Sequence, residues 1–139
     1  MKNNQTANEP SGIRLMRFMS SRLLQIVRKE HKNGNSICLY GTGEYWSAFE
    51  KSAYLLCQLF PEKEVFIAKH VEYPFPIVMT CISDDELIKY GRNHIFHRDY
   101  SNYKELYYQK TPTVPYHIWH RDKMNMFGYE IDTLYRKKN

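Results

Sequence analysis

Four of the six histidines in this chain occur in two nearly identical hexapeptides. The first is His94-Ile95-Phe96-His97-Arg98-Asp99, and the second is His117-Ile118-Trp119-His120-Arg121-Asp122. On a helix, histidines three residues apart would share one side, and two such pairs could bind zinc. The aromatic and β-branched residues favour strands instead, and Pro115 stands where a strand could begin. We therefore expect both hexapeptides to be strands.

Strand geometry separates the histidines of each pair. Side chains alternate between the two faces of a strand, so His94 and His97 would point to opposite faces, as would His117 and His120. We expect these histidines to be structural and the chain to bind no metal. The His-Arg-Asp triplet also occurs in the catalytic loop of protein kinases, but the glycine-rich loop and the strand lysine of a kinase are missing here.

Other candidate catalytic groups in the sequence are incomplete. The acidic run 84–86 could hold a nuclease metal, but it follows Ser83 directly, as acids do in the first turn of a helix with a serine N-cap. The turn 41–43 has two glycines of a nucleotide-binding loop, and Trp46 stands where the third would be. We predict no catalytic residue, no cofactor and no enzymatic activity. A small histidine-dependent or nucleotide-binding enzyme remains the alternative.

The segment 43–53 follows the apolar run 37–40 and has the strongest local pattern in the chain. Gly41 and Gly43 permit a tight turn, and apolar residues then recur at helical spacing. This pattern predicts a strand, a glycine turn and a helix over 44–59. Six residues would share the inner face of that helix: Tyr45, Phe49, Ser52, Ala53, Leu56 and Phe60.

The same segment resembles, without a gap, the signature of the N-terminal mismatch-recognition domain of the MutS family. Gly43, Glu44, Phe49 and Ala53 fit that signature, and the pair 45–46 keeps its two aromatics. The resemblance extends over about residues 13–99 as an order of segments. A helix precedes the signature, and an apolar strand after a proline, an acidic-capped helix and a further strand follow it.

The resemblance implies a nucleic-acid site around Tyr45. In the MutS family the first aromatic wedges beside a mispaired base, and a glutamate two residues later hydrogen-bonds to that base. Here these positions hold Tyr45 and Ser47, and a serine supplies no carboxylate. We expect Tyr45, Trp46 and Ser47 to contact nucleic acid without reading mismatches. The ATPase, lever and clamp parts of the family do not fit in 139 residues, so the resemblance is to a freestanding domain.

A predicted helix over about residues 11–31 carries the clearest basic concentration. Arg14, Arg17 and Arg28 lie on one face of it, where they could contact phosphates, although charged helix faces are often merely solvated. The net charge of +5 and the pI of about 9.0 favour anionic partners. The opposite, apolar stripe consists of Met16, Met19, Leu23, Ile26 and Val27.

The whole pattern predicts a single α/β (α+β) domain over 11–135, between a disordered tail at 1–10 and a basic tail at 136–139. A mixed central sheet of about five or six strands would be flanked by helices. The expected helices are 13–31, 44–59, 83–91 and 102–109. The expected strands are 36–40, 64–70, 77–82, 93–98, 116–120 and 129–135.

Two features of the sequence indicate where in the cell the protein occurs: its three cysteines and the lack of a long apolar run. Cys38, Cys57 and Cys81 each sit in an apolar segment, as reduced, buried thiols do. No run approaches the roughly 20 apolar residues that span a bilayer. We expect a cytoplasmic protein that does not contact membranes.

Twelve tyrosines interleave with basic residues, mostly in the second half of the chain. Such rings suit stacking on single-stranded bases and suit protein contacts equally well. The first hypothesis is a non-catalytic nucleic-acid-binding accessory domain, with DNA, including single-stranded DNA, as the partner. The second is a protein-interaction or adaptor module of the same fold. The sequence does not indicate an oligomeric state.

Overall fold

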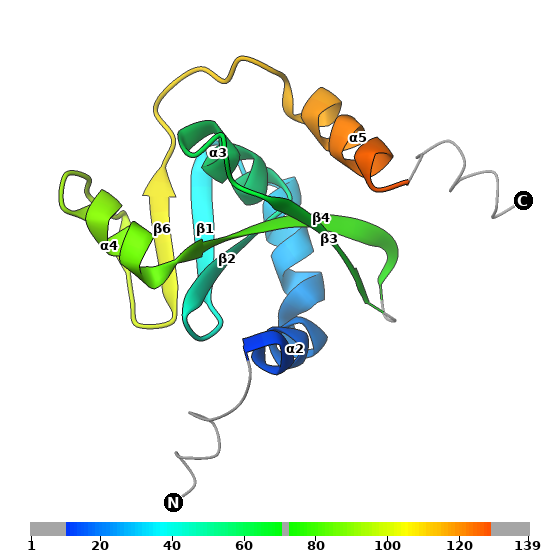
Figure 1. The fold of residues 1–139 in the computed structure, drawn as a ribbon, viewed down its shortest axis with the longest axis horizontal. Coiled ribbons are helices and arrows are strands. Elements are labelled where there is room, and N and C mark those ends of the chain that lie inside the picture. Colours follow the sequence, from blue (N-terminus) through cyan, green and yellow to red (C-terminus); the bar gives the residue numbers. More distant parts are fainter. Residues whose placement is uncertain (1–10, 71–72, 129–139) are drawn as a thin grey trace, which may run out of the picture.

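The computed structural model describes residues 11–70 and 73–128, which form a single α+β domain (Figure 1). The described residues contain four helices and a six-stranded sheet. The helices are α2 (Ser11–His31), α3 (Lys51–Leu59), α4 (Asp84–Gly91) and α5 (Tyr116–Met126). The strands are β1 (Ser36–Gly41), β2 (Tyr45–Phe49), β3 (Val65–His70), β4 (Tyr73–Ser83), β5 (Arg98–Asp99) and β6 (Tyr103–Tyr107). The tails predicted at 1–10 and 136–139 and the strand predicted at 129–135 lie outside the described residues.

The sheet has the order β3-β4-β2-β1-β6-β5, and every neighbouring pair is antiparallel. The prediction of a mixed sheet was therefore wrong. Consecutive strands form three hairpins, β1–β2, β3–β4 and β5–β6, and short connections of this kind produce antiparallel pairs. The helices α3 and α4 link one hairpin to the next.

The sheet separates two layers of helix (Figure 1). The long helix α2 covers one face alone, and α3, α4 and α5 contribute to the core on the other. The α2 layer is built from Met19, Leu23, Ile26 and Val27, which share a cluster with Cys38, Tyr40, Phe49, Ile77 and Met79 of the sheet. None of the helices in the described ranges has the length and apolar character needed to cross a membrane.

The helix predicted over 44–59 begins only at Lys51, and a strand, β2, occupies Tyr45–Phe49 instead. Residues four apart share a face in a strand as well as in a helix, so the spacing of Tyr45 and Phe49 did not distinguish the two. The backbone of Glu50 ends the strand with a φ of 49°, and α3 starts at the next residue. Pairing with β1 and β4 on both sides makes β2 a central strand.

Three further predictions were wrong. The segment predicted as a helix over 102–109 contains strand β6, which pairs with β1 along its whole length. The hexapeptide 94–99 forms only the short strand β5, and 116–120 belongs to helix α5. Pro115 precedes that helix directly, and a proline at a helix start is well tolerated because its fixed φ suits the first turn.

The remaining predicted elements within the described residues are confirmed. These are the helices near 13–31 and 83–91 and the strands near 36–40, 64–70 and 77–82. Ser83 caps α4 as expected, since its Oγ accepts a hydrogen bond from the Glu86 backbone N–H at 3.2 Å.

Candidate nucleic-acid interface

The outer face of α2 is positively charged. Arg17 and Arg28 are exposed and Arg14 is half-buried, so the structure brings the three predicted arginines to one helix that lies on the surface. The only carboxylate of α2, Glu30, is buried. The surface charge contributed by this helix is therefore positive throughout, which favours an anionic partner.

The buried Glu30 explains how α2 is joined to α3. Its Oε1 accepts from the Ser52 backbone N–H at 2.8 Å, and its Oε2 accepts from the Ser52 hydroxyl at 2.6 Å. Asn33 Nδ2 donates to Oε1 at 3.0 Å. Ser52 lies in the first turn of α3, where backbone N–H groups lack partners within the helix. Burial raises the pKa of Glu30, although these hydrogen bonds partly oppose the effect.

Two more cations of α2 lie against tyrosines of the sheet. The Arg22 guanidinium carbon is 6.0 Å from the centroid of the Tyr40 ring, and Lys29 Nζ is 4.6 Å from that of Tyr103. The rings of Tyr40 and Tyr103 are themselves 5.2 Å apart. These four side chains line a shallow pocket of about 270 Å³ together with Gln25 and Ile26.

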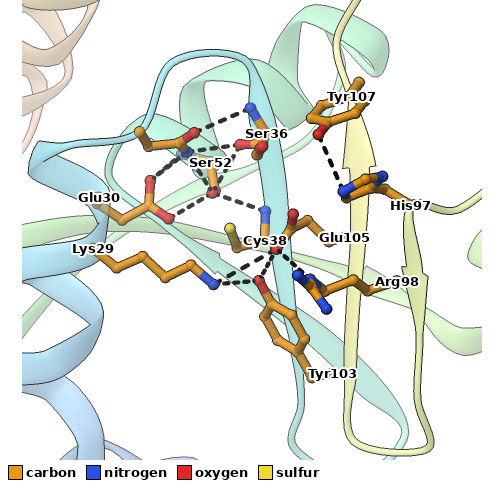
Figure 2. Close-up of polar contacts among 11 residues, drawn as sticks. Lys29, Glu30, Ser36, Cys38, Ser52, His97, Arg98, Tyr103, Glu105 and Tyr107 are labelled. Carbon is orange, nitrogen blue, oxygen red and sulfur yellow. Dashed lines mark hydrogen bonds and ion pairs between the residues drawn. The ribbon is translucent and has the colours of Figure 1, made fainter.

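Figure 2 shows that Lys29 and Arg98 approach Glu105 from different elements. Lys29 Nζ lies 3.6 Å and Arg98 Nε 4.0 Å from Glu105 Oε2. Tyr103 donates its hydroxyl proton to the same carboxylate and accepts from Lys29 Nζ at 2.6 Å. Burial raises the pKa of Tyr103, so this hydroxyl stays protonated. One carboxylate between two cations leaves the cluster positive.

The three residues predicted around the glycine turn differ in their exposure. Tyr45 is 45% exposed at the start of β2. Ser47 is fully buried, and its Oγ lies 3.2 Å from Thr42 Oγ1 and 3.5 Å from Cys81 Sγ. Trp46 is buried on the opposite face of the sheet, where its Nε1 donates to Asp84 Oδ1 at 2.9 Å. Of these three side chains, only Tyr45 offers a ring to solvent.

Two acidic residues, Glu44 and Asp84, lie near Tyr45 along the backbone. Glu44 precedes it and is exposed, and Tyr45 pairs across the sheet with Ser83, the residue before Asp84. The backbones of Glu44 and Asp84 are also joined, since Asp84 N–H donates to the Glu44 carbonyl at 3.0 Å. These charges repel phosphate, so this end of the sheet suits phosphate less well than α2 does.

The histidines are arranged differently from the prediction. His94 and His97 line the same cleft instead of pointing to opposite faces of a strand. His120 lies on α5, and its Nε2 is 2.9 Å from Glu50 Oε2, while His117 on the same helix is exposed. Within residues 11–70 and 73–128, no group of three or more potential metal ligands is close enough to hold a metal ion.

The cleft that contains His94 and His97 was missed by the sequence analysis. It has a volume of about 640 Å³ and lies between the end of α4 and the end of β6. Gly91 at the end of α4 and Asn93 just after it indicate a turn. This turn was the one signal in the sequence that the hexapeptide 94–99 would not be a regular strand.

Neither a protein-family model, nor a curated protein, nor a solved structure matches this chain.

Proposed function

We propose that this chain is a non-catalytic nucleic-acid-binding accessory domain that contacts phosphates through α2. The proposal rests on one observation, which is that the exposed charges of this helix are all positive. Five of its residues are Arg or Lys, and its single carboxylate, Glu30, is buried. Arginines on an exposed helix bind the phosphate backbone and position a protein on nucleic acid without reading sequence.

The resemblance to the MutS mismatch-recognition domain supports a role for Tyr45 in the same proposal. An exposed tyrosine ring can stack on a base. Residues 45, 47 and 49 point to the same face of β2, and Phe49 packs against α2, so Tyr45 belongs to the sheet face that α2 covers. The buried Ser47 supplies neither a carboxylate nor access to a base. We therefore propose weak binding without preference for mismatches.

A protein-interaction module is the second candidate. Three apolar side chains on the same helix are exposed and support this candidate: Ile13, Met16 and Leu24. A helix face that only binds phosphates does not need them. Exposed apolar residues that lie close together favour a protein partner.

Fluorescence anisotropy at low and moderate salt, with a matched duplex, a mismatched duplex and a single strand, tests the proposal. The variant is Arg14→Ala/Arg17→Ala/Arg28→Ala. The matched control removes three exposed cations elsewhere, Lys69→Ala/Lys89→Ala/Arg121→Ala, so that both variants lose the same net charge.

We expect the α2 variant to bind at least about tenfold more weakly, or roughly 1.4 kcal/mol, and the control to change much less. Equal losses in the two variants would show that only net charge matters. Absence of binding to all three probes at low salt would eliminate the proposal in favour of the protein-interaction module.

A further inference from the structure

We propose that the cleft between α4 and β6 is a nucleotide-binding site, which takes a planar base together with its phosphate. Tyr90, Asn93 and His94 line one side of the cleft, and His97, Tyr107 and Lys110 line the other. Its volume of about 640 Å³ lies within the range of small-molecule sites.

Aromatic rings in two fixed pairs suit the planar part of the ligand. The rings of Tyr90 and His94 are stacked 3.8 Å apart at an interplanar angle of 4°. His94 Nδ1 lies 2.8 Å from the Tyr90 carbonyl oxygen, which holds this pair in place. The second pair is His97 and Tyr107, whose ring centroids are 4.5 Å apart and which are hydrogen-bonded at 3.1 Å (Figure 2). Any nucleobase can stack on such rings, because every base has a flat aromatic face.

Two amides supply donors and acceptors for the edge of a base. Asn93 and Gln109 both line the cleft and both are exposed. A side-chain amide carries a carbonyl oxygen that accepts and an NH2 group that donates. Each amide can therefore donate to and accept from a ligand, as the edge of a nucleobase requires.

The charge of the cleft favours the phosphate. No Asp or Glu is among its lining residues, whereas Lys110 contributes a positive charge. Arg98 follows His97 in the sequence, but its side chain lies outside the cleft, with Nε 4.0 Å from Glu105 Oε2. A cation would find no carboxylate in the cleft, and an anion would meet Lys110.

The ligand chemistry has two possible sources, a free mononucleotide or one nucleotide of a single strand. The inference does not depend on the proposed role of α2, because a mononucleotide needs only the cleft. Titration calorimetry with AMP, UMP and a single-stranded octa-adenylate therefore tests the site and distinguishes the sources.

The variant is His97→Ala/Tyr107→Ala, and the matched control is His117→Ala/Tyr100→Ala, which removes an exposed histidine and an exposed tyrosine elsewhere. Tyr107 is 50% exposed, so its truncation leaves the core intact, and a thermal melt verifies that both variants fold. We expect at least tenfold weaker binding of AMP or UMP in the cleft variant and unchanged binding in the control.

Binding of the octa-adenylate alone, with the same loss in the cleft variant, would identify a single strand as the source. The inference is overturned if none of the three probes binds, or if the two double variants bind equally well. It is also overturned if mononucleotide binding is lost in the Arg14/Arg17/Arg28 alanine variant and kept in the cleft variant. That last outcome would leave the α2 proposal standing.

Discussion

At the scale of single residues, two glutamates hold helix α3 in place. Glu30 reaches from α2 to the first turn of α3. Glu50 precedes α3 with a φ of 49°, a conformation that costs free energy in a residue with a side chain. Its carboxylate accepts from the Val78 backbone N–H at 3.1 Å and lies 2.9 Å from His120 Nε2. These contacts with β4 and α5 offset the strain, so the junction of β2 and α3 depends on its neighbours.

The raised pKa of Glu30 predicts how stability depends on pH. The folded state binds this proton more tightly than the unfolded state, because burial raises the pKa above the usual 4.5. The stabilisation by Glu30 is therefore complete below about pH 4.5 and is lost as pH rises through the raised pKa. Glutamine does not titrate, so Glu30→Gln does not lose this stability as the pH rises. The free energy of unfolding of Glu30→Gln minus that of the unmodified protein should therefore increase from pH 4 to pH 7. Urea denaturation across this range measures the difference.

Glu62→Gln, which makes the same substitution at an exposed position, provides the control. A difference between Glu30→Gln and the unmodified protein that stays constant with pH would contradict the prediction.

At the scale of elements, similar hexapeptides adopt different structures. His94-Ile95-Phe96-His97-Arg98-Asp99 runs from the end of α4 into β5, whereas His117–Asp122 lies within α5. The second copy follows Pro115 and packs Trp119 against Tyr54 of α3 at a centroid distance of 5.4 Å. The first copy lies beside β6, where His97 N–H donates to the Glu105 carbonyl at 2.7 Å. Contacts outside each hexapeptide therefore determine its conformation.

The cap of α4 gives a prediction at the same scale. Ser83→Ala removes the hydroxyl that accepts from the Glu86 N–H, and loss of a serine cap costs about 1 kcal/mol. We expect the free energy of unfolding to fall by this amount in chemical denaturation. Ser101→Ala, at an exposed bend, should leave stability within about 0.5 kcal/mol. Equal stability of the two variants would show that the cap contributes nothing.

At the scale of the whole molecule, charge is distributed unevenly over the α2 side. Basic residues continue from the outer face of α2 through Lys29 to Arg98, which lies at the edge of the sheet (Figure 2). The turn between β1 and β2 carries Glu44 beside Tyr45 and adjoins the acidic first turn of α4. This distribution of charge favours a polyanion at α2 and at the β5 edge over one at Tyr45.

Salt dependence tests this arrangement. Each phosphate contact with a single strand contributes about 0.7 to the slope of log K against log salt concentration. If Arg14, Arg17 and Arg28 all contact phosphates, their replacement by alanine should reduce that slope by about 2. Anisotropy titrations at several salt concentrations give the slope, and an unchanged value would place the phosphate contacts elsewhere.

The three thiols test the compactness of the core. Burial raises the pKa of Cys57 to about 11 and raises the pKa of Cys38 and Cys81. At pH 8, a pKa of about 11 leaves a thiolate fraction about 100-fold lower than at an ordinary cysteine. A thiol reagent such as dithionitrobenzoate should therefore react slowly with the native protein and rapidly in urea. Cys38 and Cys57 are buried and Cys81 is half-buried, so rapid reaction of more than one thiol in the native protein would mean that the core opens readily.

The sequence by itself determined the elements whose signals are local. The amphipathic pattern of α2, the Ser83 cap of α4 and the apolar runs of β1 and β4 were sufficient for correct predictions. It also placed the basic face on α2, because a periodic apolar stripe leaves the remaining positions to solvent.

Only the tertiary structure decided the identity of β2 and β6 and the location of the cleft. Spacings of four residues fit a helix and a strand alike, and the hydrogen bonds that made Tyr45–Phe49 and Tyr103–Tyr107 strands come from partners distant in the sequence. His94 and Tyr107 meet in one cleft for the same reason. Strand pairing and side-chain packing join residues that no local pattern relates, so these features were fixed by the contacts of the folded chain.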